Sequence, residues 1–311
     1  MNKILTTAGL KNENEIVQGD MLYEYGTSEP VEIVYVDMHH EQLYGIHYTD
    51  GRTDTVGEFE LSMLKGISPV LYPIEFKKIH RPLNPDAYIA GIFFMVGKFD
   101  DKYVNIPDNS YAVLDTILNT LSVEEDGFAK GKLYFRSIFG GKRLSWLDIF
   151  PDHRFYSNEY WDINAPMVPE AYLNGSIESR KMFVRGAFDA AYSMSISLDE
   201  ASAIISNNSR IEILKYILNS LGVPCFVAKY GAQYKLNILG DTKYYPGLFY
   251  DHDYIARMIN SDYDIMKCDP AMKISIDSVT ELDNNYTTCY SLVTNKDTVY
   301  FGSTFLPRFY K

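Results

Sequence analysis

The chain has 311 residues, a formal net charge of −12 and a pI of about 5.0. This length suits two domains, or one domain that carries a large insertion. The acidic balance argues against a general DNA binder, because attraction to phosphates supplies most non-specific affinity for nucleic acid, although a local basic face on an acidic body is compatible with it. The sequence has no apolar run of about 18 residues and no signal-peptide pattern, so we expect a cytoplasmic protein without a membrane partner.

The cysteines and histidines indicate no metal chemistry. Cys225, Cys268 and Cys289 share no CxxC spacing, and the six histidines are scattered. Such a pattern favours neither a disulfide framework nor a zinc site. The sequence therefore predicts no metal site and no cofactor.

Residues 1–75 have the composition of β-strands. Residues 30–56 contain two runs rich in β-branched and aromatic residues, and the second ends at Asp50-Gly51, a dipeptide typical of tight hairpin turns. The segment ISPVLYPIEF at 67–76 continues in the same style. We therefore expect strands through this whole region.

From residue 84 the pattern changes to mixed helices and strands. Asn84 and Pro85 form a helix-start signal before an apolar run that is too short to cross a membrane. Ser176 and Glu178 mark the start of another helix. The other elements expected are a helix over 109–121, a strand over 130–139, two helices over 199–222, a strand–turn–strand unit over 223–240 and strands over 272–282, 287–294 and 297–305.

The middle of the chain contains an internal repeat. Each half has an apolar helix with a central glycine, Gly91 in the first and Gly186 in the second, followed by strands and an amphipathic helix. A repeat of this kind predicts two-fold pseudosymmetry. A β domain split by this insertion explains the order of elements better than three independent domains do.

Two segments of the middle block resemble the signature helices of the LAGLIDADG homing endonucleases. They are DAYIAGIFFMVG at 86–97 and VPEAYLNGSIESRKMFVRGAFDAAYS at 168–193. The residues at 207–240 also follow the helix–strand–turn–strand course of that family. The flanking segments 3–26, 34–64 and 275–306 resemble the opening, the second block and the closing strands of a Hint (intein splicing) domain.

The resemblance implies an α+β protein with a split domain. An all-β Hint-like domain, made of residues 1–78 and 266–311, would be interrupted at 79–265 by a pseudo-two-fold αββαββα LAGLIDADG endonuclease-like domain. The two halves of the inserted domain would cover about 79–165 and 166–265. The order and spacing of the motifs carry this interpretation more than any single motif does.

In that family, small residues on the two signature helices form the pseudo-two-fold interface. Carried over to this chain, the interface residues are Ala90, Gly91, Gly186, Ala187 and Ala190. A close-packed helix pair in an ordinary core would use the same small residues. Only the acidic residues at the helix ends distinguish the two interpretations.

The catalytic acids of the family are replaced in this chain. Each family helix ends in an acid that holds a divalent metal ion for phosphodiester cleavage. The first acid position is occupied by Val96 and the second by Ala191, and neither side chain can bind a metal ion. Asp189 remains at another acidic position of the motif, about 200° around the helix from the second acid position.

The residues for protein splicing are also absent. Inteins begin with a nucleophilic Cys or Ser, carry a His in the second block and end in His-Asn. Here the opening block is preceded by Met1, the second-block position falls near Glu58 or Phe59, and the C-terminal sequence is FLPRFYK. The residues for DNA cleavage and those for protein splicing are both replaced, whereas the sequence pattern of the fold is kept. We therefore expect a protein that is not an enzyme.

Three functions are compatible with such a chain. The first is a structural or protein-interaction module, plausibly a phage virion or assembly component, with other proteins as partners. The second is a non-cleaving DNA-binding protein or regulator, and the third is a residual endonuclease with displaced acids. For the second, the resemblance places these residues on or near DNA-facing strands, where they could equally belong to a solvated sheet face: Lys98, Lys102, Arg136, Lys142, Arg143, Lys229, Lys235 and Lys243.

Overall fold

The computed structural model describes residues 3–65, 69–77, 87–96, 98–99, 103–107, 124–125, 134–138, 141–145, 168, 170–191, 193–196, 201–205, 208–239, 248, 274–296 and 299–309. For residue 96, the strands between 98 and 145, and residues 193–196, 283–287 and 289, it describes the backbone alone. Within these residues, no helix is long and apolar enough to cross a membrane.

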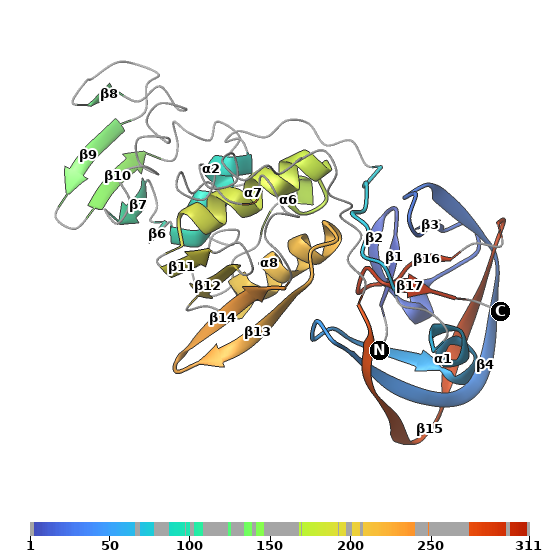
Figure 1. The fold of residues 1–311 in the computed structure, drawn as a ribbon. Helices are drawn as coiled ribbons and strands as arrows, with labels where there is room; N and C mark the ends of the chain where they lie inside the picture. The colour runs from blue at the N-terminus through green and yellow to red at the C-terminus, as the bar shows by residue number, and fades with distance from the viewer. Residues whose placement is uncertain are drawn as a thin grey trace, which may run out of the picture. The chain divides into compact units, whose positions relative to one another are not determined.

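The chain divides into two compact units (Figure 1). Unit 1 contains residues 1–78, 218–226 and 269–311, and unit 2 contains residues 79–217 and 227–268. The segment 218–226, expected from the sequence to belong to the inserted domain, thus clusters with unit 1. The Hint-like character of the flanking segments stays a prediction.

Unit 1 is built on an antiparallel sheet of six strands with the order β15-β4-β3-β1-β2, in which β5 also pairs with β4. A 3-10 turn η1 (Glu13–Glu15) and a short helix α1 (Glu58–Leu64) accompany the sheet. The strands of unit 1 are β1 (Lys3–Thr6), β2 (Gly9–Asn12), β3 (Met21–Tyr23), β4 (Pro30–Tyr48), β5 (Thr53–Gly57), β15 (Ile276–Thr294), β16 (Tyr300–Phe301) and β17 (Pro307–Arg308).

The longest feature of unit 1 is the ribbon formed by β4 and β15, each of 19 residues. The blue β4 and the red β15 run side by side in Figure 1, antiparallel and interrupted by three register shifts. The two strand segments expected at 272–282 and 287–294 are therefore parts of one long strand. Two clusters of buried apolar side chains lie along this ribbon, one around Ile46 and Leu306 and one around Leu22 and Leu292.

The predicted turn at Asp50-Gly51 is confirmed, since it joins β4 to β5. Gly51 has a φ of 77°, a conformation that glycine adopts without strain. Next to it, Asp50 Oδ2 lies 2.9 Å from Arg52 Nε, and both side chains are only 1% exposed. The Arg52 guanidinium also donates to the backbone oxygen of Thr304, so it ties this turn to the C-terminal segment.

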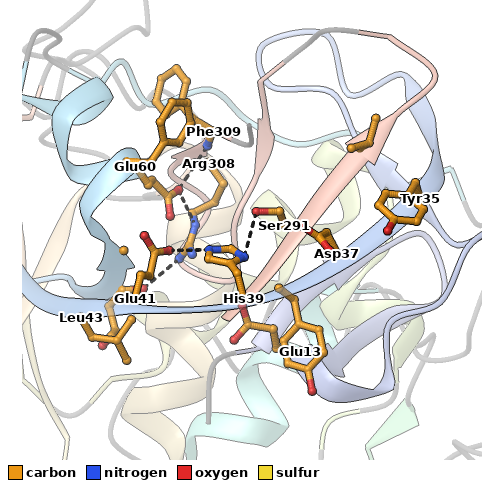
Figure 2. Close-up of a pocket in the computed structure, with 15 residues that line it drawn as sticks. Glu13, Tyr35, Asp37, His39, Glu41, Leu43, Glu60, Ser291, Arg308 and Phe309 are labelled. Atoms are coloured by element: carbon orange, nitrogen blue, oxygen red, sulfur yellow. Dashed lines mark hydrogen bonds and ion pairs between the residues drawn. The ribbon is translucent and has the colours of Figure 1, made fainter. Parts of the chain in front are cut away.

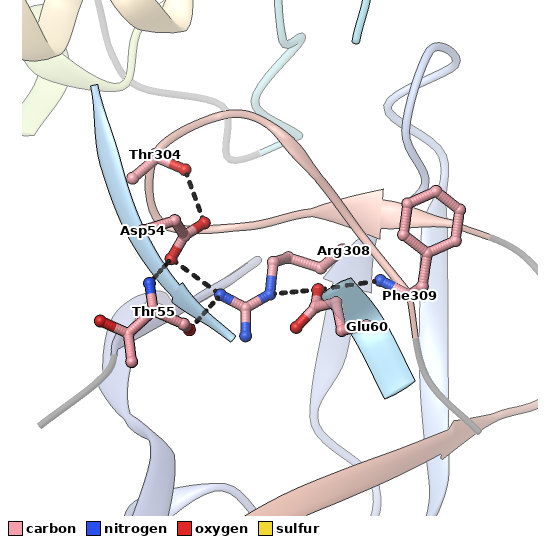
Figure 3. A network of polar contacts seen from close by, with 6 residues as sticks. All are labelled: Asp54, Thr55, Glu60, Thr304, Arg308 and Phe309. Atoms are coloured by element: carbon pink, nitrogen blue, oxygen red, sulfur yellow. Dashed lines mark hydrogen bonds and ion pairs between the residues drawn. The ribbon is translucent and has the colours of Figure 1, made fainter. Parts of the chain in front are cut away.

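A second buried ion-pair network holds the C-terminal strand β17 (Figure 3). Arg308 Nη1 lies 2.9 Å from Asp54 Oδ1, and its Nε lies 2.6 Å from Glu60 Oε1. The hydroxyl of Thr304 donates to Asp54, and the backbone N–H of Phe309 donates to Glu60. Burial raises the pKa of Glu60 to about 7, a shift that the positive charge of Arg308 opposes.

Three segments differ from the sequence-based expectations. Residues 58–64 form helix α1, because Gly57 provides an extended N-cap and two glutamates occupy the first turn. Residues 69–77 form no strand and bond irregularly, as in the bond from Ile74 N–H to the Ser220 oxygen. Residues 201–205 form strand β12 rather than a helix, since pairing on both sides outweighs a weak helical pattern.

Unit 2 repeats one arrangement of helix and strands. Among its described residues, the helices are α2 (Ala87–Val96), α6 (Glu170–Leu173), α7 (Ile177–Asp189) and α8 (Asn208–Ser220), the last of which ends within unit 1. Its strands are β6 (Lys98–Phe99), β7 (Tyr103–Pro107), β8 (Glu124–Glu125), β9 (Tyr134–Ile138), β10 (Gly141–Ser145), β11 (Ser193–Ile196), β12 (Ala201–Ile205), β13 (Cys225–Tyr230) and β14 (Gln233–Ile238).

The two sheets of unit 2 share one strand order. The first sheet follows β6-β7-β10-β9 before the short β8, and the second follows β11-β12-β14-β13. In both sheets the first strand pairs with the second, the second with the fourth and the fourth with the third. The internal repeat expected from Gly91 and Gly186 is thus present in the topology.

Helices α2 and α7 approach each other at two glycines. A Cβ atom on Gly91 would overlap the carbonyl oxygen of Phe183, and one on Gly186 would overlap that of Tyr88. Each glycine therefore contacts the carbonyl one helical turn before the other glycine, which is the relation that a local two-fold axis produces. The predicted interface residues Ala90, Ala187 and Ala190 are all buried on these helices.

The predicted start of α7 and end of α8 are confirmed. The Ser176 side chain accepts a hydrogen bond from Ser179 N–H at 3.2 Å, as an N-cap does. Gly222 follows α8 with a φ of 75°. The start expected at Asn84-Pro85 and the helix expected over 109–121 lie outside the described residues.

The Gly91→Ala variant tests the helix crossing. The added methyl group must push α7 away, so we expect a loss of about 1–3 kcal/mol or more in the free energy of unfolding. The Gly186→Ala variant should lose a similar amount, and the double variant less than the sum, because the first change already separates the helices. Chemical denaturation measures each effect.

The matched control for this test is Gly45→Ala, whose Cβ would meet only ordinary contacts, the nearest at 3.5 Å from Leu282. If the Gly45 and Gly91 variants lost equal free energy of unfolding, the close approach of the two helices would contribute no more to stability than an ordinary glycine position does.

The buried Glu60 carboxyl predicts a pH dependence. Between its ordinary value of 4.5 and its folded pKa of about 7, the folded protein holds a proton that the unfolded chain releases. Stability therefore falls as pH rises through this window. Because Glu60→Gln cannot titrate, its free energy of unfolding relative to the wild type should rise from pH 4.5 to pH 7.

Urea denaturation at several pH values measures this difference. Glu58→Gln, at an exposed carboxyl of the same helix, controls for the loss of one acidic group. Parallel curves for the wild type and Glu60→Gln across the window would contradict the prediction.

Candidate nucleic-acid interface

The two positions that match the family's catalytic acids lie at the ends of the paired helices. Val96 is the last residue of α2, and Ala191 directly follows Ala190, the C-cap of α7. Ala191 is half-buried. Neither residue carries an oxygen or nitrogen in its side chain, so neither can supply a ligand for a divalent metal ion.

The acid that remains in the second motif contacts the other helix. The hydroxyl of Tyr88 on α2 donates to Asp189 Oδ2 at 2.9 Å, and Arg185 Nε lies 4.0 Å from the same oxygen. The Arg185 guanidinium is also 6.0 Å from the centre of the Tyr88 ring. With its side chain only 11% exposed, Asp189 is placed to stabilise the helix pair.

A buried arginine at the end of α2 was not predicted from the sequence. Arg210, in the first turn of α8, donates from Nη1 to the backbone oxygen of Met95 at 2.6 Å. Its guanidinium lies 5.9 Å from the centre of the Phe94 ring, and burial lowers the pKa of Arg210. The contact places a cation at the negative end of the α2 dipole. Nothing in the local sequence NNSRIE distinguishes it from a solvated helix residue.

The first sheet of unit 2 has two faces of opposite character. Residues paired across antiparallel strands lie on the same face, and successive residues alternate between faces. One row of paired positions across four strands is polar: Lys98, Asn105, Arg143 and Arg136. The adjacent row on the other face is apolar: Phe99, Val104, Leu144 and Phe135.

This register separates two of the predicted DNA-facing residues. Arg143 shares the polar row with Arg136 and Lys98, whereas Lys142 pairs with Ile106 and so lies on the apolar face. A sequence cannot decide between adjacent basic residues until the register is known, because a shift of one residue exchanges the faces.

The second sheet repeats this division. Its mainly polar rows are Ser193–Ile204–Lys235 and Ser195–Ser202–Asn237, and the rows of its other face are Met194–Ala203–Leu236 and Ile196–Ala201–Ile238. Lys235 is half-buried on β14, and Lys229 is exposed on β13. Lys102 and Lys243 lie outside the described residues. The predicted residues that share a polar face are therefore Lys98, Arg136 and Arg143 in one sheet, with Lys235 in the other.

The comparisons with known proteins find no sequence relative. No protein-family model matches the chain, and no curated protein sequence matches it. Similarity appears only among solved structures, at low identity.

These structures are LAGLIDADG proteins. The chain is similar to full-length DUF199/WhiA from Thermatoga maritima, with a TM-score of 0.32 and 13% identity over 49% of each chain. It is similar to the N-terminal LAGLIDADG domain of DUF199/WhiA, with a TM-score of 0.33 and 14% identity over 50% of this chain and 74% of that one. It is also similar to I-DmoI in complex with DNA and Mn, with a TM-score of 0.32 and 16% identity over 49% of this chain and 87% of that one.

The similarity to solved structures covers half of this chain, and the chain covers about half the length of full-length WhiA. A likeness of this size assigns no activity. The Hint-like assignment of the flanking segments rests on the sequence resemblance alone.

Proposed function

We propose that this chain binds duplex DNA through the polar faces of the two sheets of unit 2 and does not cleave it. One observation carries the proposal. Two sheets of the same strand order each have one polar and one apolar face, and they follow two helices that cross with a local two-fold relation.

The residues on the polar faces suit a nucleic-acid partner. Arg136 and Arg143 occupy directly paired positions on β9 and β10, so two basic residues are neighbours in the register. Like charges paired in this way are unfavourable in an isolated sheet, and phosphates would relieve the repulsion. Arg and Asn side chains also make the bidentate hydrogen bonds that distinguish guanine and adenine in the major groove.

The overall charge of −12 sets a requirement for this binding. The acidic body repels DNA, so affinity has to come from a few local phosphate contacts. Binding that depends on few contacts is lost as salt screens them, and each contact contributes roughly 0.9 to the salt slope.

The two-fold relation of the helix pair bears on the target sequence. A protein with two similar reading surfaces about an axis is matched by a DNA site with two similar halves. The two faces differ in detail, with Arg136 and Arg143 in one and Lys235 and Asn237 in the other. The preferred site would therefore be pseudo-palindromic, with an arginine-read half and a more weakly contacted half.

The absence of cleavage rests on the helix ends. Val96 and Ala191 stand at the family's acid positions, and Asp189 is bonded to Tyr88. A residual endonuclease would need carboxylates from elsewhere in the chain. Uncut plasmid and genomic DNA after incubation with the protein and Mg²⁺ or Mn²⁺ is the expected result.

A structural or protein-interaction module, including a virion component with other proteins as partners, stays a prediction from the sequence alone. No observation on the described residues points to a particular protein partner. Cytoplasmic or virion localisation likewise stays a prediction.

The register provides a matched pair of variants for the DNA test. Removing both Arg136 and Arg143 should weaken binding to mixed-sequence duplex DNA in low salt by about 10-fold or more, and should reduce the salt slope by roughly 2. Lys142→Ala removes the same kind of charge from the neighbouring position on the apolar face, so its salt slope should stay close to that of the wild type. Fluorescence anisotropy over a salt series measures both quantities.

Two outcomes of these binding experiments would contradict the proposed DNA binding. Wild-type protein that fails to bind duplex DNA even at about 50 mM salt, where phosphate contacts are strong, would overturn it. Equal salt slopes for the arginine variant and Lys142→Ala would show that binding does not use the polar face.

A further inference from the structure

Unit 1 contains a cavity of about 400 Å³ that the DNA proposal does not use (Figure 2). Its wall is formed by one face of the β4–β15 ribbon, together with residues of β5, α1 and the C-terminal segment. Ligand pockets are commonly concave spaces of this size with a few convergent polar groups. The cavity lies entirely within unit 1.

Three polar side chains form a chain of contacts in this cavity, as Figure 2 shows. The Ser291 hydroxyl oxygen lies 3.5 Å from His39 Nδ1, and His39 Nε2 lies 3.1 Å from Glu41 Oε1. His39 and Glu41 alternate along β4 and so share a face, and Ser291 comes from the facing strand β15. In the neutral tautomer that donates from Nε2 to Glu41, Nδ1 is the acceptor nitrogen, 3.5 Å from the Ser291 hydroxyl oxygen.

The position of Glu41 depends on a glycine. Gly57 on β5 pairs with Leu43, and a Cβ atom at Gly57 would overlap the carboxylate of Glu41. The carboxylate therefore occupies space that any other residue at position 57 would fill. Glu41 Oε1, the carboxylate oxygen that a Cβ at position 57 would overlap most closely, is also the one that lies 3.1 Å from His39 Nε2.

Part of the cavity lining is apolar and accessible. Tyr35 is 56% exposed and Phe59 is 36% exposed, although both line the cavity, and Leu43 and Val293 add aliphatic surface. Exposed apolar side chains around a polar centre are typical of a site that takes up an apolar group. A short acyl chain would fit against them.

The other charged groups determine which substrates enter. Glu13, Asp37 and Glu60 also line the cavity, and Arg308, the cation that faces them, is paired with Glu60 and Asp54. The excess of carboxylates disfavours anionic substrates. Uncharged or cationic esters are therefore the class that suits this cavity.

We propose that this cavity is an ester-hydrolysing site in which Ser291 is the nucleophile and His39 the general base, with Glu41 as a positioning residue. The Ser291 oxygen forms a bond to the ester carbonyl carbon while its proton passes to His39 Nδ1. The bond from that carbon to the alcohol oxygen then breaks, and His39 returns the proton to the leaving alcohol. Water then attacks the acyl carbon while His39 takes a proton from it, the bond from that carbon to the Ser291 oxygen breaks, and His39 returns the proton to this oxygen, which releases the carboxylic acid and restores the Ser291 hydroxyl.

The same ribbon contains a natural comparison. On its other face, the Thr288 hydroxyl lies 3.5 Å from His40 Nδ1, a geometry close to that of Ser291 and His39. This pair is exposed, and it lies outside the cavity that holds Glu41. Variants of Thr288 and His40 therefore show how much reactivity a hydroxyl–imidazole contact gives by itself, without the cavity and without Glu41.

The first experiment uses the full chain and a fluorophosphonate probe, which bonds to a nucleophilic serine oxygen through phosphorus and releases fluoride. Intact mass and peptide mapping should find one label, on Ser291. Labelling should be lost in Ser291→Ala, fall at least about 10²-fold in rate in His39→Gln, and remain unchanged in His40→Gln and Thr288→Ala. Mapping of the wild-type protein needs no variant, so it is decisive even where a variant folds poorly.

Turnover of p-nitrophenyl butyrate tests the positioning of the base. We expect Glu41→Gln to lower kcat about 10-fold or more with little change in KM, because the carboxylate acts through His39 and does not touch substrate. Gly57→Ala, which displaces Glu41 without removing any polar group, should have the same signature.

Two results would overturn the ester-hydrolysis proposal. One is wild-type protein with no label on Ser291 and no hydrolysis above that of Ser291→Ala. The other is equal loss of activity in the His39 and His40 variants. Neither result bears on the DNA binding proposed above, which is assigned to unit 2.

Discussion

The close crossing of helices α2 and α7 at Gly91 and Gly186 is the constraint on which unit 2 depends. Each residue lies against a backbone carbonyl of the opposite helix, at a distance that leaves no room for a methyl group. Two strands follow directly from the end of each helix, so the crossing also determines where both sheets begin. The two glycines let the helices approach closely enough for the two similar halves of unit 2 to be related by a local two-fold axis. The polar faces of the two sheets are then related by the same axis.

Local signals made much of this fold predictable. The Ser176 N-cap, Gly222 after α8 and the turn at Asp50-Gly51 each depend on a residue whose conformational preference acts within its own turn. The role of Gly91 and Gly186 in the helix-pair interface was also predictable, because glycine destabilises a helix unless close packing requires it. These features need no knowledge of the rest of the chain.

What the sequence could not reveal depends on distant partners. Residues 201–205 have a weak helical pattern, and only pairing with two neighbouring strands makes them β12. The different faces of Lys142 and Arg143 follow from register, which no local preference determines. His39 and Ser291 are 252 residues apart in sequence, and neither lies in a recognisable motif, so their contact has no signal in the chain itself.

The pairing of β4 with β15 also limits when unit 1 can finish folding during synthesis of the chain. Tyr48 is a partner of Ile276, so the edge of β4 stays open until unit 2 and the residues after it have been synthesised. Closing a long loop costs entropy that grows only slowly with its length, so the residues between the two strands add little more to that cost than a shorter connection would. During synthesis, the open edge of β4 is therefore a place where the incomplete chain can pair with another chain, until β15 is made and covers it.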